Sequence, residues 1–172
     1  LEEYIGQKHL VGPGAVLHKM VTQRRVSSMI LWGPPGVGKT TLAQIIANQV
    51  EVPFYTLSAV TSGVKDVREV IERAKKNSFF SRESPILFID EIHRFSKSQQ
   101  DSLLNAVETG VVTLIGATTE NPSFEVIRPL LSRCQVYVLK SLDKADLLAL
   151  LHRAITEDVV LKEKKIKLTE TD

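Results

Sequence analysis

The segment GPPGVGKT at 33–40 has the residue types and spacing that bind a chain of phosphates. Its glycines let backbone N–H groups turn inward, and a helix that starts here adds the positive end of its dipole. Lys39 can reach the outer phosphates, and the Thr40 hydroxyl can coordinate Mg²⁺. The alternative is a glycine-rich turn that merely connects a strand to a helix, which the strand–loop–helix context disfavours. The predicted phosphate-binding residues are Gly33, Pro34, Pro35, Gly36, Val37, Gly38, Lys39, Thr40 and Thr41.

Two carboxylates, Asp90 and Glu91, follow the apolar run ILFI at 86–89. In an open parallel sheet, ligands bind at the carboxyl ends of the strands. Asp90 would hold Mg²⁺, directly or through water, and Glu91 would orient or deprotonate the water that attacks the γ-phosphate. A second carboxylate favours hydrolysis over transfer to a hydroxyl. The alternative is a surface turn that carries two carboxylates, and we interpret nearby His93 as a structural or interface residue.

Thr119 ends another apolar run, in LIGATTENP at 114–122. If this run lies beside the one that carries Asp90, the Thr119 hydroxyl would reach the γ-phosphate or the attacking water. Taken by itself, ATTENP indicates a polar turn that stops at Asn121-Pro122. Together with the two preceding motifs it predicts a γ-phosphate sensor.

The elements that must position these residues alternate between short apolar runs and helical patterns. Apolar runs at 28–32, 53–57, 85–90, 111–117 and 135–139 are separated by helical patterns at 39–50, 66–77 and 96–110. This alternation predicts an α/β fold with a mostly parallel sheet that has helices on both faces. Ser96 and Gln99 predict a capping box, and Gly110 a helix end. A further amphipathic pattern at 142–155 predicts the start of a second, helical unit.

Size and composition set limits on the function. The 172 residues suffice for one domain with a core, and 22 basic against 20 acidic residues leave a formal net charge of only +2. This balance gives no support for nucleic-acid binding. No apolar run approaches the length of a membrane span, and the start LEEYIGQ lacks the features of a signal peptide. The single cysteine suits a reducing cytosol or nucleus. Because the chain starts at Leu1 rather than Met, we expect it to be part of a longer protein.

With these motifs in this order, the chain resembles the AAA+ ATPases, and within them the replication-associated recombination protein A family, which includes relatives of the Werner-helicase-interacting protein. The similarity rests on the segments IGQKHLVGPG, LWGPPGVGKTTLA, LSAVTSGVKDVREVI, FIDEIHRFSKSQQDSLLNAVE, LIGATTENPSFEV and LLSRCQVYVL. The resemblance implies ATP and Mg²⁺, a five-stranded sheet of order 5-1-4-3-2, a nucleotide-binding core over 1–140 and the beginning of a helical lid over 141–172. The first, third and fifth segments are specific to this family, whereas the phosphate motifs indicate only the superfamily.

The resemblance also implies roles for single residues. Lys39 and Thr40 bind phosphate and Mg²⁺, Asp90 and Glu91 form the second acidic motif, and Thr119 is the first sensor. Arg133 matches an arginine finger that completes a neighbouring subunit's site, although an exposed arginine alone more often indicates a surface ion pair. The resemblance also implies an adenine pocket near Tyr4, Ile5, Gly6 and Gln7, with Lys65 facing DNA or a central channel. Cys134, beside the arginine, needs no role beyond filling a buried strand start.

At the level of the whole protein, the resemblance implies a DNA-stimulated ATPase that acts at stalled or damaged replication forks. It would assemble as a tetramer or larger homo-oligomer and bind DNA forks, ends and single-strand/double-strand junctions. Single-strand-binding protein and the replication machinery are its expected partners, without a membrane. The expected location is the bacterial cytoplasm, associated with the nucleoid, or the nucleus of a eukaryote. The remaining lid, with a second sensor arginine, and the oligomerisation region are expected after Asp172.

Four alternatives remain open. A clamp-loader subunit shares the SRC segment, but one cysteine cannot build the four-cysteine zinc module of the bacterial clamp-loader motor. A branch-migration motor has an extra hairpin before its sensor strand. Here Gly110 ends the helix and Val111 begins the strand, so the sequence leaves no room for that hairpin. An ATP-dependent assembly scaffold with little turnover is disfavoured by the intact Glu91 and Arg133. A P-loop protein of another use is the fourth alternative.

Overall fold

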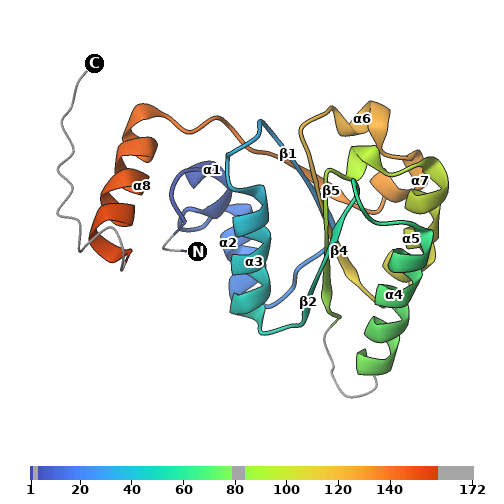
Figure 1. Ribbon diagram of the computed structural model, residues 1–172. Helices are drawn as coiled ribbons and strands as arrows, with labels where there is room; N and C mark the ends of the chain where they lie inside the picture. Colours follow the sequence, from blue (N-terminus) through green and yellow to red (C-terminus); the bar gives the residue numbers. More distant parts are fainter. Residues whose placement is uncertain (2–3, 79–83, 159–172) are drawn as a thin grey trace.

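The strands of the protein form one parallel sheet at its centre (Figure 1). The computed structural model describes residues 1, 4–78 and 84–158. The five strands are β1 (Met29–Trp32), β2 (Phe54–Ser58), β3 (Ile86–Asp90), β4 (Thr113–Thr118) and β5 (Gln135–Val138), all in parallel pairings. Their order across the sheet is β2-β3-β4-β1-β5, which confirms the order that the family resemblance implied.

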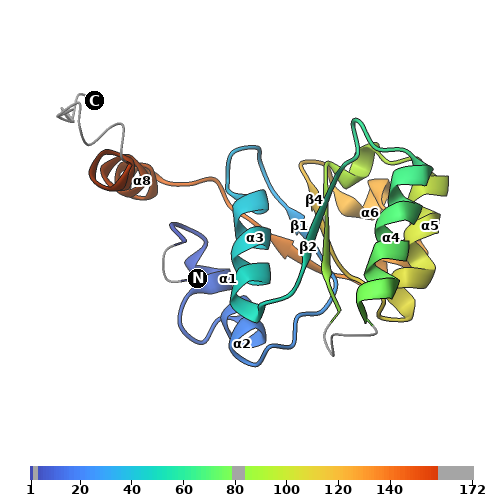
Figure 2. The ribbon, with the colours of Figure 1, turned by 60° about the horizontal axis from the view of Figure 1, so that its bottom comes forward.

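Helices cover both faces of this sheet, as the alternating pattern predicts (Figures 1 and 2). One face carries α1 (Lys8–Val11), α2 (Val16–Thr22) and α3 (Lys39–Val50). The other carries α4 (Val64–Ser78), α5 (Lys97–Glu108) and α7 (Arg128–Leu131). The 3₁₀ helix η1 (Ile92–Arg94) follows β3 directly, and α6 (Pro122–Glu125) follows β4.

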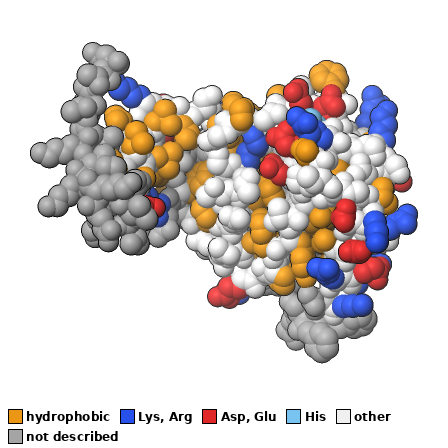
Figure 3. Space-filling view, viewed as in Figure 1, with side chains coloured by type: hydrophobic (Ala, Val, Ile, Leu, Met, Phe, Trp, Pro, Cys, Tyr) orange, Lys and Arg blue, Asp and Glu red, His pale blue; other side chains and the backbone are white. Residues whose placement is uncertain are grey.

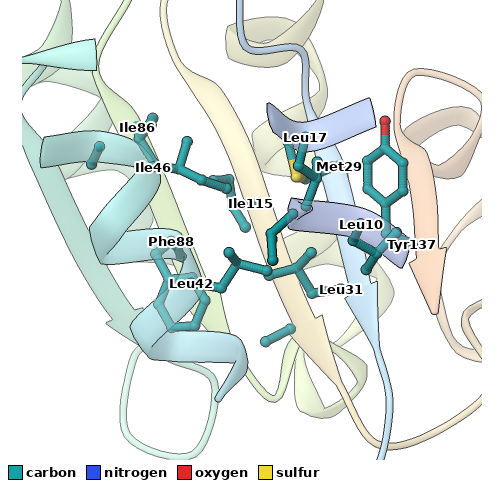
Figure 4. Packing of buried hydrophobic residues seen from close by; sticks show 14 of the residues in the cluster. Leu10, Leu17, Met29, Leu31, Leu42, Ile46, Ile86, Phe88, Ile115 and Tyr137 are labelled. Atoms are coloured by element: carbon teal, nitrogen blue, oxygen red, sulfur yellow. The ribbon is translucent and has the colours of Figure 1, made fainter. Parts of the chain in front are cut away.

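Alternation along the strands divides the core into two layers. Met29 and Leu31 of β1 pack against α2 and α3, whereas Ile30 between them packs into the layer under α5. The same holds on β3, where Phe88 lies in the first layer (Figure 4). Phe88 stacks on Phe54, with ring centroids 5.9 Å apart. Each fully buried side chain of this size contributes roughly 1.5–3 kcal/mol, so both faces of the central strands are fixed by burial.

The boundaries differ from the predicted ones between the third helix and the fourth strand. The helix α5 ends at Glu108, Thr109 is its C-cap, and Gly110 follows with a φ of 70°. The strand begins at Thr113 rather than at Val111, because the Val112 amide still bonds back to the Ala106 carbonyl. Only residues 109–112 separate the two elements, so no hairpin is inserted here. The predicted capping box of Ser96 and Gln99 is confirmed.

The last described helix, α8 (Lys144–Glu157), lies apart from the sheet, beyond α1 (Figures 1 and 2). None of its residues is buried, and Leu147, Leu150 and Leu151 are among the large apolar side chains that it exposes. Figure 3 shows apolar side chains gathered over this part of the molecule. Residues 159–172 of the predicted lid segment lie outside the described residues. Within the described part of the chain, no helix has the length and apolar character that crossing a membrane requires.

Candidate active site

The phosphate loop connects the carboxyl end of β1 to the first residue of α3. Gly36 and Gly38 have φ angles of 77° and 88°, in the left-handed region that side chains disfavour. Gly38 is the N-cap of α3, so the free N–H groups of the first helical turn open towards the carboxyl edge of the sheet. The sequence motif is therefore realised as a backbone cradle at a helix N-terminus, which is a site for anions.

Lys39 is folded back onto this loop. Its ammonium group donates hydrogen bonds to the carbonyl oxygens of Gly33 at 2.7 Å and Pro34 at 2.8 Å, and only 7% of the residue is exposed. Burial lowers the pKa of Lys39, and the negative charges of Glu91 and Asp90 oppose that shift. Phosphate oxygens are acceptors of the same kind with more charge, so a bound nucleotide can take over both hydrogen bonds.

Asp90 and Glu91 lie where the sequence places them, at the carboxyl end of β3. Asp90 is the last strand residue, paired in register with Ser58, and its Oδ1 accepts a hydrogen bond from the Glu91 amide at 3.2 Å. Glu91 has a φ of 53°, a left-handed conformation that costs about 1–3 kcal/mol outside glycine. The side chain of Glu91 is 28% exposed, so it is partly shielded and still accessible to a water molecule.

Hydroxyl and imidazole groups meet beside these carboxylates at the end of β4. The Thr118 hydroxyl lies 3.0 Å from His93 Nδ1, and His93 Nε2 lies 3.2 Å from Glu91 Oε2. The predicted sensor Thr119 follows immediately, half-buried just beyond the strand. Sequence reasoning missed Thr118, which is fully buried. Its only signal in the sequence is that two threonines follow one another. The pattern does not show which of the two faces inward.

A cavity of about 400 Å³ borders the phosphate loop on the side of the predicted adenine pocket. The Tyr4 hydroxyl lies 2.9 Å from the carbonyl oxygen of Val37 and 3.2 Å from that of Gly38, and donates towards both. Predicted residues Tyr4 and Ile5 line the cavity, whereas Gly6 and Gln7 do not. Four other lining residues belong to the predicted phosphate-binding segment, namely Gly36, Val37, Gly38 and Thr41. The remaining four were not predicted: Ile45, Leu142, Leu150 and Arg153.

Gln7 has a different place, at the junction with the last helix. Its side-chain amide donates to the Lys140 carbonyl at 2.6 Å, and its side-chain oxygen accepts from the Lys140 amide at 2.9 Å. Gln7 is buried, so these two bonds tie the N-terminal segment to the chain that leaves β5. The segment that lines the cavity is thereby fixed to the segment that leads into α8.

Arg133 lies at the other end of the sheet. Gln135, two residues later, is in register with Met29 at the start of β1, whereas the phosphate loop follows the end of that strand at Trp32. The Arg133 guanidinium forms an ion pair with Glu108 at the end of α5 and donates to the Pro129 carbonyl at 2.6 Å. The side chain is 33% exposed. It therefore does not join the group formed by Lys39 and the carboxylates of its own chain.

The remaining sequence candidates are scattered. Lys65 is exposed in the first turn of α4 and lines a surface hollow with Arg68, Glu69, Glu72, Arg73 and Lys76. Cys134 is half-buried, and burial raises the pKa of its thiol to about 12, so a structural role is sufficient for it.

The residues available for a metal ion are oxygen donors. Thr40 is exposed at the start of α3, and Asp90 ends β3 across from it. No group of three or more His, Cys, Asp or Glu side chains that could hold a metal occurs among the described residues. Mg²⁺ prefers oxygen ligands and commonly takes only one or two from the protein, with water and phosphates supplying the rest. The Thr40 and Asp90 oxygens fit that ion.

This fold and site define a P-loop nucleotide-binding protein. The family described as "ATPase family associated with various cellular activities (AAA)" matches residues 29–142. The chain belongs to this family of ATPases.

Known relatives agree. The chain is 53% identical over 157 residues to replication-associated recombination protein A of Escherichia coli K12, with 91% of this chain and 35% of the relative covered. It is 51% identical to the protein of that name in Coxiella burnetii, with 99% and 38% covered. To the ATPase WRNIP1 of Dictyostelium discoideum it is 46% identical, with 99% and 19% covered. These matches confirm the predicted resemblance, and they show that the chain spans well under half of each relative.

Among solved structures, the chain is similar to the RuvB Holliday junction branch migration motor of Thermotoga maritima. The TM-score is 0.73 at 30% sequence identity, with 91% of this chain and 52% of the other covered. The predicted AAA+ fold is thereby confirmed in three dimensions.

Proposed function

We propose that this chain is the ATP-hydrolysing module of a DNA replication and recombination factor that acts at stalled or damaged forks. ATP and Mg²⁺ are its ligands, and hydrolysis takes place at the interface between subunits. The observation that carries this proposal is the convergence of Lys39, Asp90 and Glu91 at one edge of the sheet. Membership in the AAA family supports ATP hydrolysis, and the names of the relatives support a role in replication-associated recombination.

Each residue of the site has a separate task. The loop amides and the N-terminus of α3 hold the phosphates, and Lys39 leaves its carbonyl partners to bind their outer oxygens. Thr40 and Asp90 would hold Mg²⁺, which supplies charge neutralisation at the β- and γ-phosphates. Glu91 orients the attacking water and accepts its proton. Thr119 contacts the γ-phosphate, and Tyr4 and Ile5 border the adenine.

The site is completed by a second copy. Arg133 lies at the opposite end of the sheet from its own phosphate loop, so it cannot serve that loop without a large rearrangement. A planar cation at the edge of the molecule can instead reach the phosphates of a neighbour. The full protein would form a homo-oligomer, a tetramer or larger. The segment over 141–172, of which α8 is described, would begin its lid above the 1–140 core.

The whole protein would meet DNA forks, ends and junctions, which stimulate its turnover. Its partners would be single-strand-binding protein and the replication machinery, in the bacterial cytoplasm at the nucleoid or in a nucleus. Lys65 is the described residue we propose to face DNA.

A turnover assay on the full-length protein, with and without forked DNA, tests the proposal. Removing the base should cost turnover about 10²–10⁴-fold while ATP still binds. We therefore expect Glu91→Gln to abolish DNA-stimulated phosphate release without weakening nucleotide affinity. Glu51→Gln, an exposed carboxylate at the end of α3 away from the phosphate loop, is the matched control and should behave as wild type.

Two outcomes would contradict the proposal. Turnover that survives in Glu91→Gln removes Glu91 from the reaction. Turnover at background in the wild type, together with normal assembly of Glu91→Gln, favours the assembly scaffold. A branch-migration motor is the second candidate, favoured by the similarity to RuvB. Against it, only residues 109–112 connect α5 to β4, without the hairpin expected of such a motor. ATP-dependent movement of a four-way DNA junction by the full-length protein would support it.

A further inference from the structure

His93 lies between the carboxylate of Glu91 and the end of β4. Its Nε2 is 3.2 Å from Glu91 Oε2, and its Nδ1 is 3.0 Å from the Thr118 hydroxyl. The imidazole side chain is only 12% exposed, and Thr118 is fully buried. Both ring nitrogens therefore have a partner within the protein. Glu91 follows the end of β3, and Thr118 ends the neighbouring strand β4.

Hydrogen-bond chemistry fixes the direction of the contact with Glu91. A carboxylate only accepts, so Nε2 must carry the proton that lies between His93 and Glu91. In the neutral ring, Nδ1 then accepts from the Thr118 hydroxyl. In the charged ring, Nδ1 donates, and the Thr118 hydroxyl turns to the Glu120 carbonyl, 3.1 Å away. In both protonation states the protonated Nε2 lies 3.2 Å from Glu91 Oε2, an electrostatic contact.

The ring is held in place by its surroundings. Ile92, the residue before it, is fully buried under β4. A Cβ atom at Gly116 would lie 3.0 Å from Ile92 Cδ1 and 2.7 Å from Ile30 Cδ1. The missing side chain at Gly116 therefore lets η1 approach β4 closely, which brings His93 within reach of Thr118. Gly116 thus contributes to the contact between His93 and Thr118.

Arg94 is a second cation near Glu91, but it is less suited to hold the carboxylate in one orientation. Arg94 Nε lies 3.6 Å from Glu91 Oε2, but the Arg94 side chain is 59% exposed. An exposed ion pair of this length contributes little, because solvent screens it and the side chain has other rotamers. The shielded imidazole is the group with a fixed geometry.

We propose that His93 is a positioning residue for the hydrolysis of ATP. It holds the Glu91 carboxylate in the orientation that the attacking water needs, and it links that carboxylate through Thr118 to the end of β4. Thr119, the proposed contact of the γ-phosphate, is the next residue. The state of the phosphate would therefore reach the base through one residue, the hydrogen bond between Thr118 and His93, and the 3.2 Å contact between His93 and Glu91. This inference rests on the proposed function, with Glu91 as the base.

Two substitutions separate the two contacts of the ring. The side chain of Asn reaches as far as Nδ1, so His93→Asn retains the bond to Thr118 and loses the donor to Glu91. The side chain of Gln reaches as far as Nε2, so His93→Gln retains a donor to Glu91 and loses Thr118. We expect His93→Asn to lower kcat by about 10–100-fold, since misplacing a catalytic group by about 1 Å costs up to about 10²-fold. We expect His93→Gln to keep most of the turnover.

The measurement is steady-state phosphate release by the full-length protein at several ATP concentrations, with forked DNA present. KM and the melting temperature should stay near their wild-type values in His93→Asn, because the fold and the phosphate loop are untouched. His18→Gln, a half-buried histidine on α2, is the matched control. In a Glu91→Gln background, His93→Asn should cause no further loss, since its effect is exerted through Glu91.

The outcomes distinguish a failure of the positioning role of His93 from a failure of the proposed function. If Glu91→Gln is inactive while His93→Asn has a wild-type kcat, the positioning role is overturned and the proposed function stands. If Asn and Gln lose turnover equally and the melting temperature falls, His93 is a structural residue. A basal kcat that rises in His93→Asn would mean that the contact restrains Glu91, which also overturns the proposal. Turnover that persists in Glu91→Gln is a failure of the proposed function itself.

Discussion

The phosphate loop with its carboxylates and the region around Arg133 are built differently. Lys39 is buried and bonded to two carbonyl oxygens, and Glu91 is held in a left-handed conformation against a shielded imidazole. Arg133 lies at the other end of β1 and β5, partly exposed, and its carboxylate partner Glu108 is 46% exposed. The first region is organised within one chain, whereas the second is held only by contacts that solvent can replace.

This difference is the physical basis of the proposal that two chains share each site. Buried, mutually bonded groups keep their geometry without a partner, as a catalytic centre requires. A guanidinium in an exposed ion pair can exchange that carboxylate for a phosphate at little cost, because exposed pairs are worth about 0–1 kcal/mol. A second copy of the chain is therefore the expected source of the final charge at each phosphate site.

The largest expected effect is that of removing this charge. Arg133→Ala should lower kcat of the assembled full-length protein by about 10³–10⁵-fold, the range of arginine fingers, and leave ATP affinity nearly unchanged. Phosphate release and nucleotide titration measure the two quantities. Arg25→Ala, an exposed arginine in the segment before β1, is the control. A parallel loss of ATP affinity would place Arg133 in its own chain's site and remove the contrast between the regions.

A smaller effect tests the organisation of the phosphate loop. Tyr4→Phe removes the hydroxyl that donates to the Val37 and Gly38 carbonyls, a loss of about 1 kcal/mol or roughly fivefold in ATP affinity. Burial raises the pKa of Tyr4 to about 12, so the hydroxyl keeps its proton and the difference should be constant between pH 6 and pH 9. Tyr137→Phe, whose hydroxyl bonds Gln135 and Met20, should leave affinity unchanged. An affinity difference that disappears within that range contradicts the assignment.

The smallest effect concerns the ion pair that holds Arg133 in the free chain. Glu108→Gln should change the unfolding free energy by less than about 1 kcal/mol, a shift of at most a few degrees in the melting temperature. The kcat of the assembled protein should stay within about threefold of the wild type. Glu51→Gln, which breaks a comparable exposed pair with Arg24, is the matched control. Destabilisation well beyond the control would show that Arg133 is a structural residue.

The two regions also differ in what the sequence could predict. The motif at 33–40 carries its own geometry, because its glycines and its lysine are needed at fixed spacing for one backbone conformation. The end of β3 was equally predictable, since Asp90 and Glu91 follow directly on a buried run. The strand order came from the family resemblance, because apolar runs alone do not specify which strands are neighbours.

Contacts between distant segments were not predictable. His93 is one of four histidines in the sequence, and its residue type alone assigns it no role. Its contact with Thr118 depends on how closely η1 packs on β4. The choice between Thr118 and Thr119 depends on where β4 ends, and strand ends are set by hydrogen bonds rather than by residue type. Glu108 has no pattern that links it to Arg133, because the pair forms only where α5 and α7 come together.

The central claim is that two chains share each site, and mixing two inactive variants tests it most directly. Lys39→Ala lacks the phosphate contact and Arg133→Ala lacks the arginine, so neither should turn over ATP by itself. In a mixed assembly, some interfaces combine an intact phosphate loop with an intact Arg133. Phosphate release from the mixture should therefore exceed that of either variant, rising with the fraction of mixed interfaces. Co-assembly, verified with differently tagged chains, without any recovery of turnover would contradict the account.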